Sequence, residues 1–134
     1  MAYQILVVSP DDVGRRKIAQ VLAQAGYGVC VAATFADGKR LLAQTKPDLL
    51  ITDERLADFN GLHLVLRGRF TNPHMDAIVT SPAHDREVER DAATLNARFV
   101  VHPKDPVDWL SCVSQAVAQR MTETTGVHHA MTVN

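Results

Sequence analysis

Apolar residues along the chain fall into short runs that alternate with helical stripes. Five runs are apolar on consecutive positions, which is typical of strands covered by helices on both faces. We expect these strands at residues 3–8, 28–32, 48–52, 76–80 and 98–101. Between them, apolar residues recur three and four positions apart, which predicts amphipathic helices. These helices are expected at residues 11–25, 34–46, 62–70, 84–95 and 105–120.

Several residues carry start and stop signals that agree with these boundaries. Gly26 is placed to end the first helix in a left-handed cap, and Pro47 stops the second. Thr34 precedes the second helix as an N-cap, with Asp37 three residues later. Asp105-Pro106 combines an N-cap residue with proline at the first helical position.

Five strands alternating with five helices predict one α/β domain with a parallel sheet and right-handed crossovers. The expected architecture is a flavodoxin-like (βα)5 fold with strand order 2-1-3-4-5 and helices on both faces. At 134 residues the chain is long enough for one such domain. We assign residues 1–121 to it and expect residues 122–134, which have no periodicity, to form a flexible tail.

Composition narrows the classes of protein that remain. Hydrophobic residues make up 46% and charged residues 22%, which excludes a mainly disordered chain. A formal net charge of -1 is unlike the basic surface of an autonomous nucleic-acid binder. Membrane-span and signal-peptide patterns are missing, so a cytoplasmic location is expected. Cys30 and Cys112 are then expected to be small buried thiols.

In open parallel sheets, ligands bind beyond the carboxyl ends of the strands. The residues just after each expected strand are therefore the ones to inspect for function. They are Ser9 to Asp12, Ala33 to Thr34, Asp53 to Arg55, Ser81 to Ala83, and His102 to Lys104.

Four pieces of the chain follow one another in order and at a specific spacing. They are Ile5-Leu6-Val7-Val8, Ala25-Gly26-Tyr27, Lys46-Pro47-Asp48-Leu49-Leu50-Ile51-Thr52-Asp53 and Asn60-Gly61. Through these pieces, residues 4–117 resemble the receiver domain of two-component response regulators, the CheY-like family.

The resemblance implies a role for three residues and the geometry of one peptide bond. Asp53 would be the phosphoacceptor, and Ser81 would hydrogen-bond the phosphoryl group. Phe99 would be an aromatic switch residue, and the His102-Pro103 peptide bond would be cis. The residues themselves leave other interpretations open. Asp53 could cap the next turn, Ser81 could cap the next helix, and Phe99 could simply pack.

Two departures from the family pattern weaken the expected phosphorylation site. Receivers carry two acids after the first strand that bind Mg²⁺ together with the acceptor Asp; this chain has Ser9 and Pro10 there. Mg²⁺ prefers carboxylate and other oxygen ligands. Of the ligands that the resemblance implies, Asp53 and the backbone carbonyl of Arg55 are still present.

The neighbouring Asp11 and Asp12 are expected to start the first helix, where acids suit the helix dipole. One of them reaching the pocket through water is the alternative. His102 is the second departure, because it stands where the family has a lysine. A neutral imidazole offers a donor without the charge, and Lys104 is the nearest other cation in sequence.

Two hypotheses about function follow from these residues. In the first, the chain is a stand-alone receiver that takes a phosphoryl group at Asp53 from a histidine kinase or phosphotransfer protein, with weakened help from Mg²⁺. Its signal would be read from the face of the fourth helix, fifth strand and fifth helix, by a downstream protein or through homodimerisation. In the second, it is a pseudo-receiver that binds a protein partner without phosphorylation.

An enzyme is the third class and fits the sequence less well. Residues 9–14 are not the phosphate loop of a flavodoxin, and Arg55 stands where a haloacid-dehalogenase phosphatase needs a second Asp. A Walker loop is also missing. No helix-turn-helix follows the receiver-like part, so direct nucleic-acid binding is not expected. Membrane binding is not expected either, because the apolar runs are far shorter than a membrane span.

Overall fold

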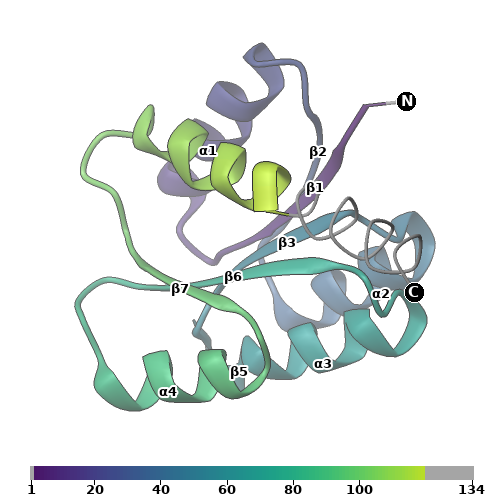
Figure 1. The fold of residues 1–134 in the computed structure, drawn as a ribbon, viewed down its shortest axis with the longest axis vertical. Helices are drawn as coiled ribbons and strands as arrows, with labels where there is room; N and C mark the ends of the chain where they lie inside the picture. The colour runs from purple at the N-terminus through teal and green to yellow at the C-terminus, as the bar shows by residue number, and fades with distance from the viewer. Residues whose placement is uncertain (1, 120–134) are drawn as a thin grey trace, which may run out of the picture.

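The computed structural model describes residues 2–119, and a five-stranded parallel sheet runs through its centre (Figure 1). The order of the sheet is β2-β1-β3-β6-β7. Counting only these five strands along the chain, this is the predicted order 2-1-3-4-5. Their bounds are β1 Gln4–Val8, β2 Gly28–Ala32, β3 Leu49–Asp53, β6 Asp76–Ser81 and β7 Arg98–Val101.

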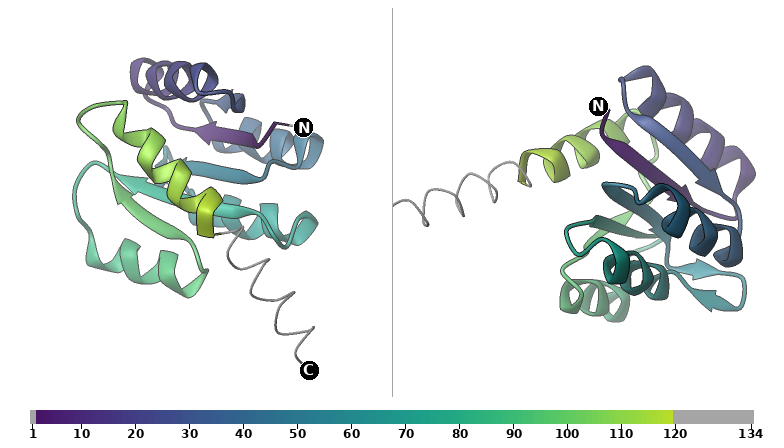
Figure 2. Two further views of the ribbon diagram at one scale, coloured as in Figure 1. Left: turned by 45° about the horizontal axis from the view of Figure 1, so that its top comes forward. Right: turned by 90° about the vertical axis from the view of Figure 1, so that its right-hand side faces the viewer.

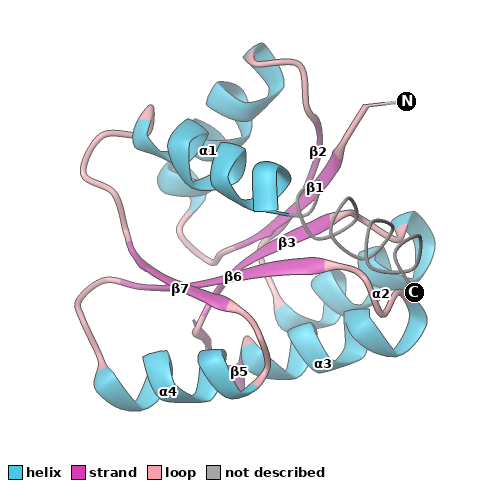
Figure 3. Ribbon diagram, in the orientation of Figure 1, coloured by secondary structure: helices cyan, strands magenta, loops and turns pink. Residues whose placement is uncertain are grey.

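Helices cover both faces of the sheet, as predicted (Figures 2 and 3). α1 (Asp12–Gln24) and a C-terminal helix (residues 108–119) pack on one face. α2 (Phe35–Thr45), α3 (Leu62–Thr71) and α4 (Arg86–Thr94) pack on the other. The predicted tail, residues 122–134, lies outside the described residues.

Strand β1 illustrates why the sheet strands lack a polar face. Leu6 and Val8 belong to the core beneath α2, α3 and α4, whereas Ile5 and Val7 belong to the core beneath α1 and the C-terminal helix. All four are at most 1% exposed. Successive side chains point to opposite faces, so a strand buried twice must be apolar throughout.

Most of the predicted helix signals act as expected. The Thr34 hydroxyl accepts a hydrogen bond from the Asp37 amide at 3.1 Å, and Gly26 has a φ of +99° after α1. The fourth helix is shorter than predicted: it starts at Arg86, because the carboxylate of Asp85 caps it. The interpretation of Ser81 as the cap of this helix is therefore wrong.

The C-terminal helix also begins later than predicted. The Asp105 side chain accepts a hydrogen bond from the Val107 amide at 3.0 Å, and residues 105–108 form a turn. Regular helix starts at residue 108. Trp109 is 3% exposed and belongs to the core beneath this helix.

A small hairpin between β3 and α3 was not predicted. It consists of β4 (Arg55–Leu56) and β5 (Phe59–Asn60), with Ala57 at a φ of +56° in the turn. Two-residue strands are too short to show a period of two, so the sequence gives no pattern for them.

Two further predictions concern cysteines and membranes. Cys30 and Cys112 are free thiols, each partly buried. Across residues 2–119 there is no helix whose length and apolar character would let it cross a bilayer.

Candidate functional site

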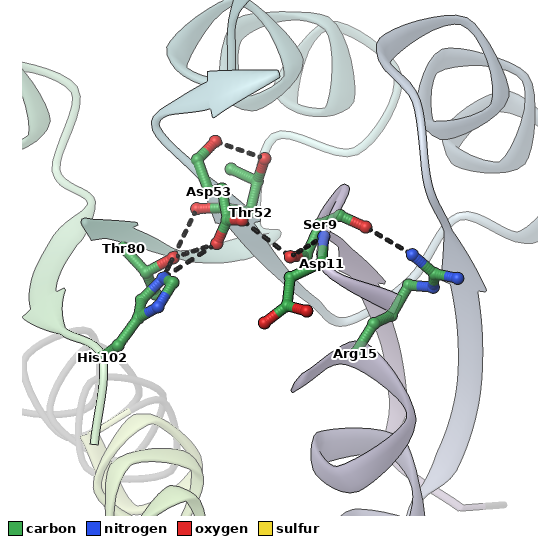
Figure 4. Close-up of polar contacts among 7 residues, drawn as sticks. All are labelled: Ser9, Asp11, Arg15, Thr52, Asp53, Thr80 and His102. Atoms are coloured by element: carbon green, nitrogen blue, oxygen red, sulfur yellow. Dashed lines mark hydrogen bonds and ion pairs between the residues drawn. The ribbon is translucent and has the colours of Figure 1, made fainter. Parts of the chain in front are cut away.

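The carboxyl ends of β1, β6 and β7 bring three polar side chains to Asp53 at the end of β3 (Figure 4). Asp53 is the last residue of β3, and its side chain is 17% exposed. Ser9 follows β1, Thr80 lies on β6, and His102 follows β7. This is the sheet edge where ligands of such folds bind, as the sequence predicts.

Both carboxylate oxygens of Asp53 accept hydrogen bonds. The Ser9 hydroxyl donates to Oδ2 at 2.7 Å, and the Thr80 hydroxyl donates to Oδ1 at 2.6 Å. His102 Nε2 lies 3.0 Å from the same Oδ1. An imidazole donates from Nε2 only when that nitrogen carries a proton, so this contact favours the protonated ring or its Nε2–H tautomer.

Strand register explains why Thr80 reaches Asp53. The two residues are directly opposite each other in the parallel pairing of β3 with β6. Directly paired residues point to the same side of a sheet. The amide of His102 donates to the Ser81 carbonyl at 3.0 Å, which extends the pairing of β6 with β7 by one residue and brings the imidazole to the site.

The contact between Asp53 and His102 shifts the pKa of both groups. Burial by itself raises the pKa of Asp53, but the hydrogen bonds from His102, Thr80 and Ser9 outweigh burial and leave this pKa below its ordinary 3.8. The hydrogen bond to Asp53 raises the pKa of His102 above 6.5, against the opposing effect of burial. The negative charges of Asp53 and Asp11 add to that rise.

Comparison with known proteins agrees with this geometry. The sequence matches the response regulator receiver domain over residues 5–108, most of the chain. The protein belongs to the response regulator receiver family. Receiver domains of two-component systems are signalling modules that are generally not enzymes.

Two curated relatives are similar across this receiver. The transcriptional regulatory protein GlrR of Escherichia coli is 30% identical over 122 residues, which cover 89% of this chain and 27% of GlrR. AfsQ1 of Streptomyces coelicolor, also a transcriptional regulatory protein, is 30% identical over 99 residues, covering 74% of this chain and 44% of AfsQ1. The chain thus spans less than half the length of either regulator.

A solved structure confirms the fold. The receiver domain protein (CheY-like) from Methanospirillum hungatei superimposes with a TM-score of 0.84, covering 92% of this chain and 99% of that one. The two sequences are 23% identical.

The hydroxyl that contacts the Asp53 carboxylate from β6 belongs to Thr80, which sequence reasoning missed. Its neighbour Ser81, which closes β6, is the residue predicted to hydrogen-bond the phosphoryl group. Adjacent residues on a strand point to opposite faces, so choosing between them requires the register. The prediction for Ser81 concerns a phosphoryl group and stays a prediction.

The prediction for Pro103 is wrong, whereas the switch role predicted for Phe99 is not tested by the structure. The peptide bond between His102 and Pro103 is trans, so the predicted cis bond is wrong. Trans is the ordinary preference even before proline. Phe99 packs against the core beneath α4, and its ring meets the His84 ring edge-on at 6.0 Å. Packing is therefore observed, and the switch role stays a prediction.

The acids after β1 lie as the helix interpretation predicts. Asp11 is the N-cap residue of α1, and Asp12 is in the first turn. Asp12 forms ion pairs with Arg15 at 2.6 Å and Arg16 at 3.2 Å. Arg15 also donates to the Ser9 backbone carbonyl at 2.7 Å, which ties this pairing to the site.

Mg²⁺ is the cofactor that the family implies, and the oxygen atoms around Asp53 are poorly suited as its ligands. Asp53 already accepts hydrogen bonds on both oxygens, Ser9 donates its hydroxyl proton, and Pro10 has no side-chain oxygen. Within residues 2–119, no three His, Cys, Asp or Glu side chains are grouped to hold a metal ion. The carbonyl of Arg55 as a ligand stays a prediction.

The shifted pKa values predict how this site responds to pH. Because its pKa is lowered, ionised Asp53 stabilises the fold at pH values above its ordinary pKa of 3.8. This contribution is lost as the pH falls through the lowered pKa. Because its pKa is raised, protonated His102 stabilises the fold at pH values below its ordinary pKa of 6.5. This contribution is lost as the pH rises through the raised pKa. We therefore expect the ion pair of Asp53 and His102 to stabilise the fold most between pH 3.8 and pH 6.5.

NMR titration of the His102 ring measures this directly. Wild-type His102 should titrate above 6.5, and Asp53→Asn should lower its pKa because the main cause of the rise is removed. An unchanged His102 pKa in Asp53→Asn would contradict the pairing.

Proposed function

We propose that this receiver domain accepts a phosphoryl group on Asp53, with His102 supplying positive charge in place of the usual lysine. The observation that carries the proposal is the contact of 3.0 Å between His102 Nε2 and Asp53 Oδ1. A raised His102 pKa favours the imidazolium beside the acceptor. This would partly restore the charge that the sequence lacks at the lysine position.

In the proposed reaction, an Asp53 carboxylate oxygen attacks the phosphorus of a phosphohistidine or small phosphodonor. The new P–O bond forms an acyl phosphate while the bond from phosphorus to its donor atom breaks. The lowered pKa of Asp53 keeps the carboxylate ionised near neutral pH. Imidazolium and hydroxyl donors at His102 and Thr80 would turn toward the transferred oxygens and stabilise their charge.

A histidine kinase or phosphotransfer protein in the cytoplasm is the proposed phosphodonor. For the output we propose the face of α4, β7 and the C-terminal helix, which a downstream protein or a second copy would bind. Val101 at the end of β7 is 39% exposed, and Val107 before the last helix is 56% exposed. Two exposed valines on this face support a contact surface.

Binding without phosphorylation is the second candidate function. The observation that favours it is the completeness of the hydrogen bonds on Asp53, together with donors that suit Mg²⁺ poorly. A carboxylate held by three donors must give up some of these bonds to react. In this case the same output face would bind its partner constitutively.

Mass spectrometry of the intact protein distinguishes the two functions. We expect incubation with acetyl phosphate to add one phosphoryl group to the wild type and none to Asp53→Asn. The yield should depend only modestly on Mg²⁺, because the donors of the site suit the cation poorly. Failure to form an adduct under any condition would favour the second function, and strict dependence on Mg²⁺ would contradict the weakened metal site.

A further inference from the structure

One face of α3 points away from the core and is not used by the fold. His63, Leu66, Arg67 and Phe70 follow the spacing of three, four and seven residues that places side chains on one side of a helix. Leu66 is 53% exposed and Phe70 is 89% exposed. A neighbouring pair of large apolar side chains this exposed marks a candidate binding surface.

α2 lies beside α3 (Figures 1 and 2). Side chains of the two helices line a groove. The groove has a volume of about 630 Å³, and Phe35 and Lys39 line its α2 side. Phe59 on β5 stacks on Phe35 with ring centroids 4.7 Å apart and is itself 55% exposed. The apolar surface therefore continues from the groove onto the hairpin.

The charged residues of the groove all have the same sign. Lys39 and Arg67 line it together with His63, and among residues 2–119 no acidic side chain does. Neither Lys39 nor Arg67 has a salt-bridge partner anywhere in residues 2–119. An apolar groove lined by unpaired cations complements a segment with apolar and acidic residues.

We propose that the α2–α3 groove binds an amphipathic helix of a partner protein, with acidic residues beside its apolar face. Apolar anchors at positions i, i+3 or i+4 and i+7 of that helix would contact Leu66 and Phe70. Its acids would pair with Lys39 and Arg67. The groove is separate from the face of α4, β7 and the C-terminal helix, so binding does not require phosphorylation of Asp53.

Charge argues against a second copy of this chain as the occupant. A twofold contact between two α2–α3 grooves places the same surface on both sides. Lys39 and Arg67 would then meet the same cations, and like charges across an interface are unfavourable.

NMR titration with designed peptides tests the proposal. The probe is an amphipathic peptide of about fifteen residues, long enough for a helix, with leucine and phenylalanine anchors flanked by glutamates. A matched peptide replaces each glutamate by lysine. We expect the acidic peptide to shift amide signals of α2 and α3 and to bind about tenfold more tightly than the basic one.

Three variants identify the side chains responsible. Phe70→Ser should weaken binding of the acidic peptide about tenfold, whereas Val13→Ser, at an exposed position on α1 outside the groove, should not. The double substitution Lys39→Glu and Arg67→Glu should reverse the charge preference. Because Phe70 is highly exposed, its replacement should leave the fold intact.

Four outcomes would overturn the proposal. They are equal binding of both peptides, no binding at millimolar concentration, shifts confined to α4 and β7, and unchanged binding by Phe70→Ser. Sedimentation velocity of the free protein adds an independent arm. Self-association that Phe70→Ser abolishes would show that a second copy occupies the groove, whereas a monomer at the concentrations of the titration supports the proposal.

Discussion

Ser9→Asp is expected to make both the stability of the protein and its phosphorylation respond to Mg²⁺. Ser9 is 5% exposed, and its hydroxyl lies 2.7 Å from Asp53 Oδ2. A carboxylate at this position would lie close to the Asp53 carboxylate, and the repulsion between them costs free energy in the absence of a cation. Mg²⁺ would offset that repulsion and gain a second acidic ligand.

The measurement is the free energy of unfolding in urea with and without MgCl₂. For a cation that binds only the folded state, a concentration of a hundred times the Kd adds about 2.7 kcal/mol. We expect a gain of this order for Ser9→Asp and little change for the wild type. Ser9→Asn is the matched control, since it adds similar bulk without charge.

Phosphorylation provides a second readout of the same change. Metal ions neutralise charge during phosphoryl transfer, so Ser9→Asp should form the acetyl-phosphate adduct faster with Mg²⁺ than without. If Mg²⁺ affected Ser9→Asp and Ser9→Asn equally, the missing acid at this position would not be what limits the response to Mg²⁺.

The sequence predicted the fold well because its signals are local and repeated. β1 and β3 are apolar on both faces, which already requires helices on both sides of the sheet. Gly26 ends α1 and Thr34 caps α2, and both signals depend only on neighbouring residues in the chain. The start of α4 was predicted two residues too early, at residue 84, because the sequence analysis did not recognise that the Asp85 side chain caps the helix.

The location of the candidate site could be predicted from the sequence, but the contacts between its side chains could not. The place of Asp53 at the end of a buried strand follows from sequence order, and so do the departures at Ser9 and His102. That Thr80 rather than Ser81 contacts Asp53 depends on a register between strands 27 residues apart. The effect of Asp53 on the pKa of His102 likewise depends on a distance that no local pattern contains.

The α2–α3 groove illustrates the same limit for surfaces. The spacing of Leu66 and Phe70 on one side of a helix can be read from the sequence, but such stripes usually face a core. Here the core side of α3 is supplied by Leu64, Val65 and Gly68, which are buried. The exposed stripe could therefore be recognised only after the packing was known.

Gly61→Ala is expected to destabilise the fold strongly and to disturb the phosphorylation site with it. Gly61 has an ordinary helical backbone, with φ -60° and ψ -23°, so conformational freedom is not the reason for glycine here. The reason is space: a Cβ at Gly61 would overlap the carbonyl oxygen of Asp53 and lie 2.8 Å from Thr52 Oγ1. The obstructing atom is backbone at the end of β3, and it cannot rotate away.

The strand end and the start of α3 would have to separate to admit the methyl group. The Gly61 amide donates to the Glu54 carbonyl at 2.7 Å, and this bond would be strained as well. We expect a loss of about 3 kcal/mol in the free energy of unfolding, at the upper end for overpacking. Because the clash is with Asp53 itself, the folded fraction should also show an altered His102 titration.

Gly14→Ala is the matched control, because Gly14 lies in α1 and the atom nearest to its added Cβ is Asp11 Oδ2 at 2.6 Å. That oxygen ends a flexible side chain that can turn away. Replacing a helical glycine by alanine gains up to about 1 kcal/mol, so Gly14→Ala should be neutral or stabilising. Urea denaturation of the two variants compares them directly. Equal effects would mean that close contact with the Asp53 carbonyl is not what requires glycine at position 61.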